Sequence, residues 1–187
     1  MKLRSNLLLV LGTLTFVSLS CSSGSSASQV PISGGSASVE TAERIISLSP
    51  TATEILFALE AGNQVVAVDD QSNFPEAAPM TSLSGYTPNI ESIAEYQPDL
   101  VVASYDPGDL VAGLKALGVA TLLQPAASSM EDTYVQINEL GVLTGRQSEA
   151  SELIESIKSD LDEIASKKVG EGLTYYHEID NTFYSPT

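Results

Sequence analysis

Short apolar runs that are continuous, and that are separated by helical segments, restrict this chain to few folds. The runs at 44–48, 65–68, 98–103 and 119–123 are rich in Val, Ile and Leu and do not alternate with polar residues. Such runs are typical of strands buried on both faces, and their alternation with helices indicates a parallel sheet between two helical layers. We therefore predict an α/β fold with a Rossmann-like parallel sheet over residues 43–127.

Residue pairs that cap helices mark where two of the helices should begin. Thr51 with Glu54, and Ser128 with Glu131, have the spacing of a capping box. In this motif each side chain satisfies a backbone N–H of the other residue. The pairs predict helices beginning at Thr51 and Ser128, and we expect Gly62 to stop the first of them.

The second half of the chain changes from strands to long helices. The helix that begins at Ser128 should run to Thr144, and residues 147–168 form one amphipathic helical pattern. Its apolar stripe consists of Ala150, Leu153, Ile154, Ile157, Leu161, Ile164 and Ala165. We predict a helical spine over 128–170, followed by the first strand of an incomplete second α/β lobe over 171–187. A site between the two lobes would then be only half encoded in these 187 residues.

The N-terminus has the features of an export signal. Two basic residues precede an apolar run at 7–19, which is short for a membrane span, so residues 1–20 are predicted to be a signal peptide. Cys21 follows directly and is the only cysteine. Its surroundings resemble a bacterial lipobox, which implies lipidation of Cys21; an ordinary secretory signal with an incidental cysteine is the alternative. The Ser- and Gly-rich remainder of 21–42 predicts a flexible tether.

The charge balance excludes some partners. The chain has 24 acidic and 8 basic side chains and a net charge of −16 at pH 7. Such an acidic protein is not expected to bind nucleic acid or to lie flat on an anionic membrane. We expect an exported monomer that a lipid anchor holds at the outer face of the cell membrane or in the periplasm.

The loops at one edge of the predicted sheet carry the candidate ligand contacts. In an open parallel sheet, ligands bind beyond the carboxyl ends of the strands. The candidates in those loops are Gln71, Tyr86, Ser104, Tyr105 and Asp106. Tyrosine rings offer contact area and polar groups offer direction, which suits a large amphipathic ligand. The alternative is that surface loops are commonly rich in such side chains.

Sequence patterns of catalysis are missing from the 187 residues. There is no phosphate loop of Walker type and no Gly-x-Gly-x-x-Gly, and His177 is the only histidine. This chain alone therefore cannot build a His-based triad or a site with several His ligands. We predict that the protein is not an enzyme and has no cofactor or metal site of its own. A lobe of an α/β hydrolase or transferase, completed by further sequence, is an alternative, although no nucleophile is followed by a base.

Five segments, in order along the chain, are similar to one class of transport proteins. They lie at 45–59, 73–75, 89–93, 97–102 and 175–180. The first opens with Ile45, Ile46 and Ser47, and the third contains an Asn-x-Glu motif. Together they resemble the cobalamin and ferric-siderophore class of ABC-transporter solute-binding proteins, and the resemblance extends from about residue 44 to the end of the chain.

The resemblance implies a function and a role for Glu91. Proteins of this class have two lobes joined by a rigid helical spine, close little on their ligand, and deliver cobalamin, haem or an iron–siderophore complex to an ABC permease. Any metal would then arrive inside the ligand. One Glu of each lobe docks onto arginine residues of the permease. The first corresponds to Glu91, and the second would lie beyond Thr187.

Two alternatives to this interpretation stay open. Glu91 follows Asn89 in the first turn of a predicted helix, where the helix dipole already favours an acidic residue. The chain could also be a tethered surface lipoprotein that docks a protein partner through its acidic face. In that case Glu91 would matter for function, whereas Tyr86 and Tyr105 would not.

Overall fold

The structure is a computed structural model that describes residues 41–167, 172 and 174. Its elements are, in chain order, β1 (Ile45–Leu48), α1 (Pro50–Ala58), η1 (Gly62–Gln64), β2 (Val65–Asp69), β3 (Met80–Leu83), α2 (Ile90–Ala94), β4 (Leu100–Ala103), α3 (Leu110–Ala116), β5 (Ala120–Leu123), α4 (Met130–Thr144) and α5 (Gln147–Ser166). The predicted signal peptide, Cys21, the strand of the second lobe and His177 lie outside the described residues, as does nearly all of the tether.

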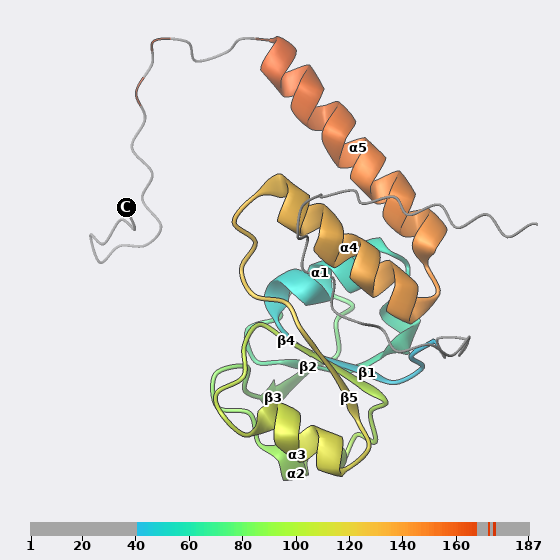
Figure 1. The fold of residues 1–187 in the computed structure, drawn as a ribbon, viewed down its shortest axis with the longest axis vertical. Helices are drawn as coiled ribbons and strands as arrows, with labels where there is room; N and C mark the ends of the chain where they lie inside the picture. The colour runs from blue at the N-terminus through green and yellow to red at the C-terminus, as the bar shows by residue number, and fades with distance from the viewer. Residues whose placement is uncertain (1–40, 168–171, 173, 175–187) are drawn as a thin grey trace, which may run out of the picture. The chain divides into compact units, whose positions relative to one another are not determined.

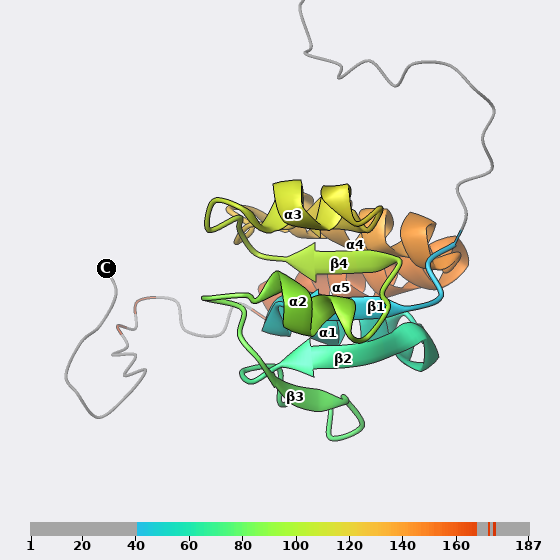
Figure 2. The same ribbon diagram turned by 90° about the horizontal axis from the view of Figure 1, so that it is seen from below.

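The five strands form one parallel sheet with the order β3-β2-β1-β4-β5. Ile45 of β1 pairs with Val65 of β2 on one side and with Leu100 of β4 on the other. The arrows of β2 and β4 in Figure 2 point the same way, and every strand pair is parallel. This order is that of a doubly wound fold, in which the chain moves outward from β1 in both directions. The predicted α/β fold with a parallel sheet is therefore confirmed.

Helices cover both faces of the sheet, and each face has its own core. In Figure 1, α1, α4 and α5 lie on one side of the strands and α2 and α3 on the other. Ile45 belongs to the core under α1, whereas its neighbour Ile46 belongs to the core over α2 and α3. Successive residues of a strand point to opposite faces. Burial on both faces explains why the run in β1 is apolar at consecutive positions.

Strand β3 was not predicted from the sequence. Its four residues, Met80–Leu83, pair with β2 at the edge of the sheet, and only Leu83 is buried. An edge strand that is exposed along most of its length has no continuous apolar run. The pattern that identified the central strands therefore does not apply to it.

The predicted start and end of α1 were wrong by a few residues. Ser49, not Thr51, is the N-cap: its Oγ accepts a hydrogen bond from the N–H of Ala52 at 3.4 Å, and a proline at the first helical position already has the required φ. The helix ends at Ala58, and the chain then reverses at Glu60, which has φ +57°. Gly62, the predicted stop, begins η1 instead.

The predicted cap of α4 was wrong by one residue. Ser129 is the N-cap, because its Oγ accepts a hydrogen bond from the N–H of Asp132 at 3.1 Å. The Asp132 carboxylate in turn accepts from the hydroxyl and the N–H of Ser128, at 2.6 and 3.0 Å, and these bonds lower the pKa of Asp132. The end of the helix at Thr144 was predicted correctly, and Gly145, with φ +72°, is its C-cap.

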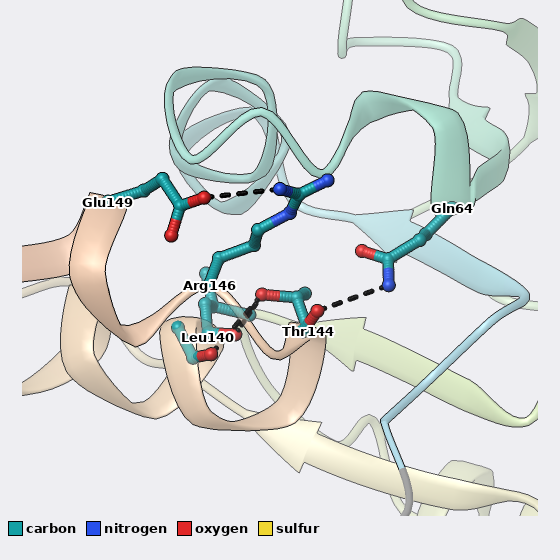
Figure 3. A network of polar contacts seen from close by, with 6 residues as sticks. Gln64, Leu140, Thr144, Arg146 and Glu149 are labelled. Carbon is teal, nitrogen blue, oxygen red and sulfur yellow. Dashed lines mark hydrogen bonds and ion pairs between the residues drawn. The ribbon is translucent and has the colours of Figure 1, made fainter.

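Polar contacts hold the junction between α4 and α5, as Figure 3 shows. The Gln64 amide donates to the Thr144 carbonyl at 3.2 Å, and the Arg146 guanidinium pairs with Glu149 at 3.1 Å. A Cβ atom on Gly141 would lie 2.6 Å from the Cβ of Ala150 and 3.1 Å from the Arg146 carbonyl oxygen. Gly141 therefore occupies a helix interior because the next helix leaves no room for a side chain.

The stripe of α5 is covered along its first half only. Ala150 and Ile154 are buried, and Leu153 and Ile157 pack against the same core. Farther along, Leu161 is 41% and Ile164 64% exposed. No helix within the described residues is long and apolar enough to span a membrane.

Candidate functional site

A cavity of about 190 Å³ opens at the carboxyl ends of the central strands. Each of four strands or the loop after it contributes two lining residues: Leu48 and Pro50 at β1, Asp69 and Gln71 at β2, Gly85 and Tyr86 at β3, and Ser104 and Tyr105 at β4. It lies between the neighbouring strands β1 and β4. The chain leaves β1 for α1 on one side of the sheet and leaves β4 for α3 on the other side. Doubly wound folds bind their ligands at this point.

Four of the five predicted ligand contacts meet in this cavity. Gln71, Tyr86, Ser104 and Tyr105 all line it, although they come from three separate loops. Asp106 does not line it. Its carboxylate instead accepts hydrogen bonds from the N–H groups of Gly108 and Leu110, at 2.8 and 3.1 Å, at the start of α3. A direct contact between Asp106 and a ligand stays a prediction.

Two tyrosines form an aromatic rim on the cavity. The side chain of Tyr86 is 69% exposed and that of Tyr105 43% exposed. The Tyr105 hydroxyl donates to the Tyr86 carbonyl at 2.7 Å, which joins the loop after β4 to the loop after β3. The second loop is also held by Ser84, whose Oγ accepts from the N–H groups of Tyr86 and Thr87 at 3.2 and 3.1 Å. Exposed rings on loops held in this way present apolar area to a ligand.

The wall of the cavity rests on buried polar groups. The hydroxyl of Thr53 lies 2.8 Å from that of Ser47 and 3.1 Å from that of Ser72, and all three residues are buried. The carboxylate of Asp69, which is 2% exposed, accepts a hydrogen bond from the N–H of Ser72 at 2.9 Å. Buried hydrogen-bonded groups of this kind specify one loop conformation. They connect β1, α1 and the loop after β2, to which the cavity residue Asp69 is also bonded.

The sequence matches the model of one known protein family. The model described as periplasmic binding protein matches residues 45–183, most of the chain. The chain belongs to this family. The match includes the whole sheet and the four strand ends that line the cavity.

Individual proteins are also similar to this chain. The chain is 32% identical over 130 residues to the uncharacterized ABC transporter substrate-binding lipoprotein YvrC of Bacillus subtilis, with 67% of this chain and 41% of that protein covered. It is 30% identical over 145 residues to the vitamin B12-binding protein of Vibrio parahaemolyticus, covering 75% and 52%.

A solved structure also matches the fold. A possible iron-binding (periplasmic solute-binding) protein of Staphylococcus epidermidis superposes with a TM-score of 0.61 and 28% identity, covering 74% of this chain and 54% of that one. The chain thus spans about half the length of the curated relatives it matches.

In this member of the family, a second hollow that the sequence did not predict adjoins the first. It has a volume of about 340 Å³, shares Ser104 with the first cavity, and is closed by the loop 124–127 after β5. Gln124 is buried there, and its amide donates to the Gln136 carbonyl at 3.0 Å and to the Glu139 carboxylate at 3.2 Å. The rule that ligands bind at carboxyl ends of strands applies equally to β5 and would have identified this loop.

Glu91 lies on the surface in the first turn of α2, as predicted. Asn89 is the N-cap and accepts a hydrogen bond from the N–H of Ser92 at 2.9 Å. Glu91 itself is exposed and lines neither hollow. Figure 2 shows α2 beginning on the arrowhead side of the sheet, and Glu91 is in the first turn of this helix.

Proposed function

We propose that this protein is the substrate-binding component of an ABC importer and is not an enzyme. It captures cobalamin, or a haem-type or iron–siderophore chelate, between two lobes and delivers it to a permease. The observation that carries the proposal is the 190 Å³ cavity with its rim of Tyr86 and Tyr105, at the switch point of a periplasmic binding protein fold. A cavity of this size would contact one side of such a ligand.

The relatives support cobalamin as the first ligand to test. The vitamin B12-binding protein of Vibrio parahaemolyticus shares 30% of its residues with this chain over the matched region. Aromatic rings over neutral polar groups, here Gln71 and Ser104, fit the flat apolar face and polar rim of a large chelate. Cys21 would anchor the protein to the membrane through a lipid, and the residues up to 42 would let the lobe reach its permease.

The test is calorimetric titration of the protein, expressed as its gene encodes it, with three chelates. Cyanocobalamin, haemin and a ferric hydroxamate siderophore represent the three ligand classes. We expect saturable binding of one of them with a 1:1 ratio. If none of the three binds, chelate capture is refuted, and docking of a protein partner through the acidic surface becomes the better explanation.

Glu91→Ala is expected to leave ligand affinity unchanged but to reduce permease-dependent uptake by about 10-fold or more. Ligand affinity should not change, because Glu91 is exposed and does not line the cavity. Uptake should fall, because a close charge pair across a protein interface contributes about 1.5 kcal/mol or more to binding. Uptake of labelled ligand by cells, measured beside calorimetry, separates the two effects. Glu95→Ala, at the other end of the same helix, is the matched control. A loss of ligand affinity in Glu91→Ala would place this residue in the binding site instead.

A further inference from the structure

We infer that the cavity selects chelates whose edge presents hydrogen-bond donors and no carboxylates, and that Asp69 is the residue that makes this selection. This inference rests on the proposed function and narrows its ligand class. Two observations support it. One oxygen of the Asp69 carboxylate has no hydrogen bond within the described residues, and no basic side chain there lines the cavity.

Asp69 is a buried acid at the wall of a cavity. It is the last residue of β2, is 2% exposed, and lines the 190 Å³ hollow. Its Oδ1 accepts the N–H of Ser72 at 2.9 Å. Its Oδ2 makes no hydrogen bond with any residue that the structure describes. A carboxylate oxygen with no hydrogen bond can accept one from a donor group of a ligand. Because Asp69 lines the cavity, such a donor would belong to a ligand bound there.

Gly85 leaves space beside this oxygen. A Cβ atom at position 85 would lie 2.5 Å from Asp69 Oδ2 and 2.9 Å from the Leu48 carbonyl oxygen. Any other residue would therefore place carbon against the carboxylate, whereas glycine leaves open the space next to it. Gly85 and Asp69 both line the cavity, so the space that glycine leaves beside the carboxylate lies at the cavity wall.

No positive charge in the described part of the chain compensates Asp69. The basic residues there are Arg44, Lys115, Arg146, Lys158 and Lys167, and none of them lines either hollow at this edge. Arg44 donates to the carbonyls of Tyr96 and Gln97, just before β4 and thus at the opposite edge of the sheet. A ligand carboxylate entering the cavity would lose its hydration and meet Asp69 with no cation in this lobe to pair with.

The candidate chelates differ in whether their edge carries hydrogen-bond donors or carboxylates. A corrinoid such as cyanocobalamin carries amide side chains around its ring, and their N–H groups can donate to Asp69 Oδ2. Haem carries propionate carboxylates on its edge, which can only accept. Hydroxamate siderophores that carry amide or ammonium groups belong with the first class. The cavity therefore favours an amide-bearing chelate over a carboxylate-bearing one.

The test compares Asp69→Asn with Asp70→Asn in the protein as its gene encodes it. Asparagine keeps the shape of the side chain and, through its carbonyl oxygen, the bond to Ser72, but an NH₂ group replaces Oδ2. Asp70 is exposed, precedes the same loop and lines neither hollow, so its substitution removes the same charge outside the site. Cyanocobalamin, a ferric hydroxamate siderophore and haemin are the probes, titrated by calorimetry, and a thermal melt confirms that each variant is folded.

We expect wild-type protein to bind cyanocobalamin or the hydroxamate siderophore, and to bind haemin at least 10-fold more weakly. Asp69→Asn should lose about 10-fold in affinity for the preferred chelate, the value of one hydrogen bond to a charged group, while haemin affinity stays the same or rises. Asp70→Asn should resemble wild type. The ratio of the two affinities within one variant does not depend on how much of the sample is folded.

Two results would overturn the inference and leave the proposed function in place. The first is tighter binding of haemin than of the other probes by wild type. The second is equal affinity of Asp69→Asn and Asp70→Asn for the preferred chelate. Failure of wild type to bind any of the three probes would refute the proposed function, and the selection by Asp69 with it.

Discussion

Replacing Tyr86 and Tyr105 together by alanine is expected to weaken ligand binding by about 2 kcal/mol or more, which is roughly a 30-fold increase in Kd. Both rings are exposed at the rim of the cavity and come from loops after different strands. Truncation removes the only aromatic area that lines this cavity within the described residues. Calorimetric titration with the chelate that binds wild type most tightly measures the loss.

Tyr105→Phe serves as the matched control for this pair. It keeps the ring of Tyr105 but removes the hydroxyl that donates to the Tyr86 carbonyl at 2.7 Å. If the rings themselves contact the ligand, Tyr105→Phe should lose much less affinity than Tyr105→Ala. Equal losses would mean that Tyr105 acts by holding the Tyr86 loop. Unchanged affinity in the double alanine variant would refute the assignment of the cavity as the binding site.

Gly141→Ala should lower the free energy of unfolding by about 1–3 kcal/mol, the usual effect of overpacking a tight contact. Helix propensity alone predicts the opposite sign, since alanine in a helix interior is favoured over glycine by about 1 kcal/mol. The new methyl group would lie 2.6 Å from the Cβ of Ala150, much closer than two carbon atoms can approach, so the helices must separate. Urea unfolding followed by circular dichroism measures the change.

The swap variant Gly141→Ala with Ala150→Gly checks the cause. Moving the methyl group from α5 to α4 restores the space between the helices, so the swap should recover part of the lost stability. The recovery is incomplete because the Arg146 carbonyl oxygen, at 3.1 Å, still limits the space at position 141. A swap variant no more stable than Gly141→Ala alone would show that the contact with Ala150 does not limit stability.

The central sheet could be predicted from the sequence because its strands are buried on both faces. In β1 and β4 every residue is buried, so the apolar runs are continuous and easy to recognise. Edge strand β3 could not be predicted, because only Leu83 is buried and the strand therefore has no continuous apolar run. The helix caps were misplaced by one or two residues because neighbouring Ser and Thr residues compete as caps, and only the backbone geometry decides between them.

The candidate site was predictable to the extent that topology determines it. The carboxyl ends of parallel strands meet at one edge, which places Gln71, Tyr86, Ser104 and Tyr105 around one cavity. Asp106, one residue farther along, turns back to its own backbone, and the preceding residues give no sign of this. Asp69 was not proposed as a ligand contact because its burial follows from contacts between distant segments. Ligand contacts as such stay predictions until a titration is made.

The core on the α1 face of the sheet combines residues that are far apart in the sequence, and this delays folding. Its core combines Ile45 with Ile137 and Ile154, and the central strand β1 pairs with β4 only after several intervening elements. Contacts this distant in sequence form slowly, because long loops must close first. As the chain is synthesised, most of the described part must leave the ribosome before this core can close. If residues 1–20 are the signal peptide that the sequence predicts, this late closure of the core would keep the chain unfolded for export until α4 and α5 have been synthesised.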